Sequence, residues 1–202
     1  MASPSRFTSG VSTQAPGKPL SSYPLPDPNR TSGTSGMGVT TYANDFQVLG
    51  STEYTVTGTS STAALSTTVV GGALVLTPGG TTTATSAYKT TQTFQFIAGQ
   101  RFWFETRVQV SALAGTEYVG LQAGSATTDG LWFTISATGA VALVSTVGST
   151  ATTIVASTAF TSVAAATWVE LSYHYTGTDL LVYQNGVTVA RVSNPTIGSS
   201  GT

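Results

Sequence analysis

The chain has 202 residues, enough for one substantial domain and a tail, and only 7% of them are charged, against roughly 25% in an average soluble protein. Seven basic and eight acidic side chains leave a net charge of −1, which excludes a nucleic-acid-binding domain, an acidic solvating tail and a polybasic membrane anchor. No cysteine is present, so disulfides, thiolate zinc sites and thiol catalysis are also excluded.

The composition predicts an all-β protein. The hydrophobic fraction of 40% is ample for a core, and Thr, Val and Gly are abundant while Glu, Lys and Leu are scarce. The start of the chain lacks the apolar segment of a signal peptide, and no apolar run approaches the roughly 18 residues that a membrane span needs. We therefore expect folding in a reducing cytoplasm and no membrane partner.

The first part of the chain differs from the rest, because six of the eight prolines lie within residues 1–28. The segment Tyr23–Pro28 is close to a polyproline II sequence, and a Gly/Ser/Thr hinge follows at Thr31–Gly36. Proline cannot donate to a sheet ladder and restricts the residue before it. The pattern predicts an extended arm over residues 1–38 and a β domain over residues 39–202.

Ordering such an arm costs about 1–2 kcal/mol of backbone entropy per residue, and its apolar residues are too sparse to form a core of their own. Either the arm is an unattached, semi-rigid leader, or it docks on another surface. Its prolines and its regularly spaced anchors favour docking. The predicted docking residues are Arg6, Phe7, Val11, Lys18, Leu20, Tyr23 and Leu25.

From residue 39 onward the pattern is that of strands and turns. Apolar residues alternate with polar ones in Arg101–Val110 and in Thr167–Tyr175, as expected for strands with one buried face. In Asp179–Val192 the pair Asn185-Gly186 separates two β-rich runs and predicts a type I′ hairpin. Further strands are expected at 44–49, 54–58, 63–69, 73–77, 83–88, 92–97, 117–123, 131–136, 140–146 and 151–156. No helix is expected beyond one short turn at Ala164–Ala166.

The residues that could carry catalysis are few. The single histidine, His174, is expected to be a half-exposed sheet residue, because no Gly-x-Ser-x-Gly elbow and no His/Asp/Glu cluster accompanies it. No acidic residue lies within four positions of another in the β-domain segment from 100 onward, although Glu105 and Glu170 could still meet across strands. We expect no catalytic residue, no metal and no cofactor.

A sugar-binding face is the alternative that the residues leave open. Trp103, Glu105 and Arg107 share one strand face, while Trp168 and His174 share another, and a tryptophan beside polar groups suits a saccharide. The structural interpretation is that these side chains pack beneath a loop. The candidate glycan residues are Trp103, Glu105, Trp168 and His174.

Several motifs resemble those of the laminin-G-like, concanavalin-type jelly rolls, which are two-sheet antiparallel sandwiches. They are the aromatic strand Arg101–Val110, Glu117–Gln122, Asp129–Phe133, Trp168–Tyr173 and the hairpin over Asn185-Gly186. The resemblance implies a jelly-roll fold and brings no catalytic residue with it. The chain departs from these jelly rolls by ending at Ser193–Thr202 without a further apolar strand, so that either the sheet closes differently or a neighbouring copy supplies a strand.

The leader resembles virion proteins of tailed bacteriophages in the segments Pro4–Thr13 and Lys18–Pro28. In these proteins a similar leader precedes a jelly roll on the capsid surface. The resemblance implies a non-enzymatic decoration protein of the virion, assembled in the host bacterial cytoplasm. Its expected partners are the major capsid protein and further copies of the chain, as a trimer or dimer at a symmetry axis. The alternative is a carbohydrate-binding adhesin or tail-fibre module, whose partners would be surface glycans.

Overall fold

The computed structural model describes residues 46, 54–57, 60–69, 72–78, 86–89, 96, 99–122 and 129–197. The predicted arm, with all its docking residues, lies outside them, as do most residues of the strands predicted at 44–49 and 92–97. The chain forms two compact units, of which one is Thr40–Thr93 and the other includes Phe94–Thr202. Within the described residues, no helix is long and apolar enough to cross a membrane.

The smaller unit consists of two antiparallel strand pairs. β1 (Tyr54–Thr57) pairs with β4 (Ser86–Lys89), and β2 (Thr62–Leu65) pairs with β3 (Leu74–Thr77). The strand predicted at 63–69 ends earlier, because the hydroxyl of Ser66 accepts hydrogen bonds from the backbone N–H groups of the turn that follows. None of the side chains that the structure describes in this unit is buried.

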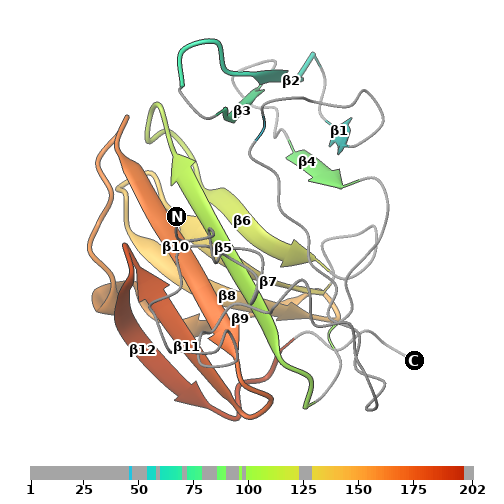
Figure 1. The fold of residues 1–202 in the computed structure, drawn as a ribbon, viewed down its shortest axis with the longest axis vertical. Helices are drawn as coiled ribbons and strands as arrows, with labels where there is room; N and C mark the ends of the chain where they lie inside the picture. Colours follow the sequence, from blue (N-terminus) through green and yellow to red (C-terminus); the bar gives the residue numbers. More distant parts are fainter. Residues whose placement is uncertain are drawn as a thin grey trace, which may run out of the picture. The chain divides into compact units, whose positions relative to one another are not determined.

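The larger unit is a sandwich of two four-stranded antiparallel sheets (Figure 1). The front sheet has the order β12-β11-β10-β5, and the back sheet has the order β6-β7-β8-β9. The strands of the front sheet are β5 (Phe102–Gln109), β10 (Trp168–Tyr175), β11 (Asp179–Gln184) and β12 (Val187–Ser193). Those of the back sheet are β6 (Glu117–Gln122), β7 (Gly130–Ile135), β8 (Val141–Val147) and β9 (Thr150–Val155).

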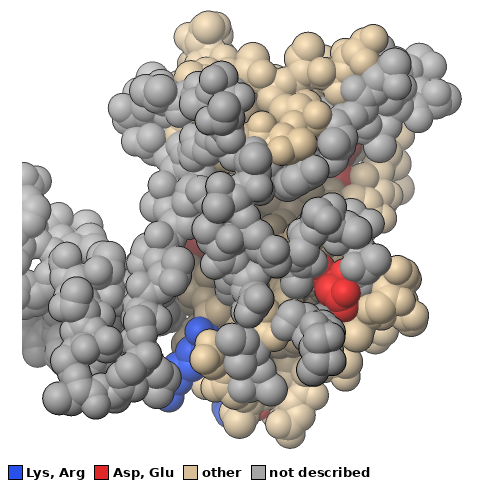
Figure 2. Space-filling view, turned by 90° about the vertical axis from the view of Figure 1, so that its right-hand side faces the viewer, with Lys and Arg blue, Asp and Glu red and all other residues tan. Residues whose placement is uncertain are grey.

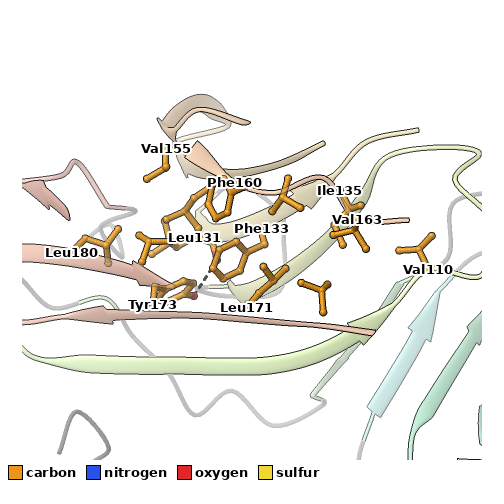
Figure 3. Packing of buried hydrophobic residues seen from close by; sticks show 14 of the residues in the cluster. Val110, Leu131, Phe133, Ile135, Val155, Phe160, Val163, Leu171, Tyr173 and Leu180 are labelled. Atoms are coloured by element: carbon orange, nitrogen blue, oxygen red, sulfur yellow. Dashed lines mark hydrogen bonds between the residues drawn. The ribbon is translucent and has the colours of Figure 1, made fainter. Parts of the chain in front are cut away.

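These bounds confirm the all-β prediction, and each strand of the back sheet lies within one residue of its predicted ends. The period-two alternation explains the two layers, because every second residue of a strand faces the opposite sheet. Phe133 of β7 and Tyr173 of β10 point toward each other between the sheets, with ring centroids 5.5 Å apart (Figure 3). The phenol of Tyr173 also donates a hydrogen bond to the carbonyl of Leu131, 3.1 Å away in the back sheet. The fully buried residues around them are Ile135, Val141, Leu143, Leu171, Leu180 and Val182.

The hairpin predicted at Asn185-Gly186 is confirmed, with φ of 51° and 74° at its two turn residues. Asn185 also joins this turn to β10, because its side-chain oxygen accepts a hydrogen bond from the Glu170 N–H and its own N–H donates to the Glu170 carbonyl. A second turn of the same kind joins β8 to β9 at Gly148 and Ser149, with φ of 53° and 69°. The two turns fix the register of β11 with β12 and of β8 with β9.

The connection from β9 to β10 covers one end of the core. It contains the single-turn 3₁₀ helix η3 (Ser157–Ala159), which the sequence did not predict, and buries Phe160 and Val163. The buried side chain of Gln184 holds this connection to the front sheet, because its amide oxygen accepts from the Thr161 N–H at 2.8 Å and its NH₂ donates to the Thr161 carbonyl at 2.7 Å. A short turn forms at Ala165–Ala166, within the segment predicted for it.

Candidate functional site

The outer face of the front sheet carries the predicted glycan residues. β5 and β10 pair in a continuous antiparallel register, so the outward residues of one strand lie directly opposite those of the other. This pairing was not predictable from the alternation within each strand alone. The facing pairs are Trp103 with His174, Glu105 with Ser172, Arg107 with Glu170, and Gln109 with Trp168.

Three aromatic rings gather at one end of this face. The ring of Trp103 lies 5.6 Å from that of His174 and 5.8 Å from that of Tyr183, measured between centroids. Burial and the nearby Arg101 lower the pKa of His174, which favours the neutral imidazole. We call Trp103, His174 and Tyr183 the ring cluster. A neutral, aromatic surface of this kind can contact the apolar face of a sugar or another planar group.

Glu105 lies beside the ring cluster. Its pKa is raised, first by partial burial and then by the charge of Glu170, which is its diagonal neighbour on β10. The nearby indole N–H of Trp103 offsets part of this rise in the pKa of Glu105. The indole nitrogen is buried, and its geometry falls short of a hydrogen bond. Glu105 and Glu170 therefore lie close enough across the strands for the charge of Glu170 to raise the pKa of Glu105. The sequence had left open that these two residues meet across strands.

Arg107 does not neutralise these carboxylates by an ion pair. Although it lies directly opposite Glu170, its guanidinium carbon lies 4.9 Å from the ring centroid of Trp168 in a cation–π contact. The one ion pair among the described residues is that of Arg191 with Asp179, at 2.6 Å. The outer face of the front sheet thus combines two neighbouring carboxylates with a separate, cation-stacked tryptophan.

The predicted glycan residues do not all come together. Trp103, Glu105 and His174 are neighbours, whereas Trp168 pairs with Gln109, six residues farther along β5. At about 3.3 Å per residue, this separates the two tryptophans by roughly 20 Å. Tyr183 was not predicted, although the short Gly-containing connection Thr176–Thr178 between β10 and β11 is a hairpin signal, and this hairpin sets Tyr183 opposite Ser172.

The outer face of the back sheet is different, because none of its outward strand residues is charged. Tyr118 of β6 is 66% exposed. The ring of Trp132 lies against Gly130, where a Cβ would overlap it. In the space-filling side view, most of the described residues that can be seen are uncharged (Figure 2). The residues of this face are Tyr118, Gly120, Gln122, Trp132, Thr134, Ala142, Val144, Thr146, Ala151 and Thr153.

Within the part of the chain that the structure describes, no group of three or more His, Asp or Glu side chains gathers in a way that could hold a metal ion. The chain matches no protein-family model, and neither a curated protein nor a solved structure is significantly similar to it. The functional proposal therefore depends on the sequence and on the surface chemistry of the two sheets.

Proposed function

We propose that this chain is a non-enzymatic structural protein that decorates the exterior of a tailed-phage capsid and stabilises its shell. The observation that carries the proposal is the uncharged, hydroxyl-rich outer face of the back sheet. Because such a face does not repel its neighbours, many copies can crowd on one surface. The arm over residues 1–38 would then lie along the major capsid protein and collect contact area that the compact sandwich lacks.

The proposal includes the finer fold and the location. The sandwich would be a jelly roll of the concanavalin or laminin-G type, standing on the capsid surface as a dimer or trimer at a symmetry axis. The pairing of β5 with β10 supports this fold, because the four strands between them in sequence all belong to the other sheet. Long connections of this kind are typical of Greek-key sandwiches.

The test of the arm uses the full-length chain. Replacing Phe7, Leu20, Tyr23 and Leu25 together by serine should lower the affinity for capsids that lack the protein by at least about 100-fold, because each buried apolar side chain contributes roughly 1.5–3 kcal/mol. Binding is measured by co-sedimentation with the capsids, and near-UV circular dichroism shows whether the sandwich is intact.

The matched control replaces Thr8 and Thr13 by serine, which alters the same segment without removing an apolar anchor. This variant should bind as the unmodified chain does. A truncated chain that lacks residues 1–38 should fold and fail to bind. Capsid binding of the four-serine variant or of the truncated chain at the original affinity would reject the arm as the docking element.

A second candidate function, carbohydrate binding, is favoured by the ring cluster with Glu105 at its side. Aromatic rings next to a carboxylate are a common arrangement for stacking a sugar and accepting its hydroxyl hydrogen bonds. On this interpretation Trp103→Ala should abolish glycan retention on an array, whereas Trp132→Ala on the back sheet should leave it unchanged. Equal retention by both variants, or no retention by the unmodified chain, would remove this candidate.

A further inference from the structure

The outer edge of β9 is an unpaired edge of the back sheet. β9 pairs with β8 on one side only, and its residues Thr150–Thr153 are all exposed. Over the described residues, no backbone hydrogen bond is made from the other side of these four residues. An edge of this kind offers its unpaired N–H and C=O groups to another strand.

β9 also lacks the devices that protect a sheet edge over its exposed segment Thr150–Thr153, because its one register shift, at Ile154, lies beyond that segment. It contains neither a charged residue nor a proline, and Thr, Ile and Val make up most of it. The other edges contain such devices. β12 has Arg191, paired with Asp179, and a bulge opposite Val182/Tyr183. β5 carries Glu105 and Arg107, and β6 begins with Glu117.

We propose that two copies of this chain join through β9, which pairs antiparallel with its counterpart about a two-fold axis and makes one continuous eight-stranded sheet. The two-fold axis must be perpendicular to the sheet, so a residue can oppose only one that faces the same side. The register centred on Ala151 satisfies this condition. In this register the paired residues lie in the regular part of β9, after the turn at Gly148-Ser149 and before the register shift near Val155.

The partner is a second copy because the segment is complementary to itself. In this register Ala151 opposes Ala151 of the other copy, and Thr150 opposes Thr152 in both directions. Threonine pairs across strands are favourable, and no like charges meet. No charged residue occurs between Asp129 and Glu170, so the neighbouring strands β7 and β8 add no charge. The inference goes beyond capsid docking and does not depend on the arm.

Cysteine trapping tests the pairing directly, because the chain contains no cysteine of its own. Ala151→Cys should bring two thiols together on the axis and give a disulfide-linked dimer at least about ten times faster than Thr188→Cys on the exposed edge strand β12. The full-length chain is used without capsids, under a mild oxidant. Cross-linking of Ala151→Cys no faster than that of Thr188→Cys would overturn the proposal.

A charge variant gives an independent measurement. Replacing Thr150 and Thr152 by lysine would set each new ammonium opposite another in the paired strands, and should raise the dimer dissociation constant at least about tenfold in sedimentation velocity. The control Thr188→Lys should dimerise as the unmodified chain does. An unmodified chain that stays monomeric, or a lysine variant that dimerises equally well, would also overturn the pairing. Neither result would bear on the arm, which is tested with capsids.

Discussion

Phe133→Ala is expected to lower the free energy of unfolding by about 3–5 kcal/mol. Phe133 is fully buried, and its ring contacts Tyr173 at 5.5 Å and Phe160 at 6.2 Å between centroids. Removing the ring loses the transfer free energy of its burial. It also leaves a cavity, because the two hydrogen-bonded sheets cannot approach each other enough to fill the space. Urea denaturation followed by fluorescence measures the loss.

Tyr118→Ala is the matched control for this change, because Tyr118 is an aromatic residue of the adjacent strand that is 66% exposed. Its replacement should change the stability by less than about 1 kcal/mol. If Phe133→Ala costs no more than Tyr118→Ala, the contact between the front and back sheets is not what stabilises the sandwich.

Gly139→Ala is expected to destabilise the fold by about 2–4 kcal/mol, since two costs add at this position. Gly139 has a φ of +77°, which an L residue adopts only with strain, and a Cβ there would overlap the carbonyl oxygen of Val163. The same two residues are joined by the hydrogen bond from the Val163 N–H to the Gly139 carbonyl, at 2.8 Å. The connection that covers the core would therefore be pushed away from the β7–β8 turn.

Gly148→Ala separates the two costs. Gly148 also has a positive φ, of 53°, but a Cβ there would meet nothing within 4 Å. Its replacement should cost only the backbone strain, about 1–2 kcal/mol. Chemical denaturation of the two variants in parallel gives the comparison, and equal losses would show that the contact with Val163 contributes nothing.

The elements that sequence analysis predicted well are those with a local signal. The alternation in β5 and β10, and the Asn185-Gly186 turn, are each contained within about ten residues, so the strands follow from period and turn chemistry. The single turn of η3 has no such signal, because Ser157–Ala159 lacks a side-chain cap and buries no residue. The grouping of the strands into two compact units also has no counterpart in the sequence pattern.

The candidate site was predicted only in part, because the sequence signals that place its residues are local as well. The faces of β5 and β10 follow from the alternation within each strand, but their register does not. Sequence analysis therefore named Trp103, Glu105 and His174 correctly as residues of outward faces, without showing that Trp168 is distant from them. Register depends on contacts between strands that are far apart along the chain, and these are fixed by the core rather than by local preference.

The pairing of β5 with β10 has a consequence for biosynthesis. β5 is synthesised before any strand of the back sheet, whereas its only described neighbour in the front sheet is synthesised after β9. The edge of β5 that pairs with β10 therefore stays unpaired while the four intervening strands are translated. A nascent chain stalled at this stage exposes an unpaired strand edge to chaperones and to other polysomes, so we expect pauses in translation through β6–β9 to lower the yield of native protein.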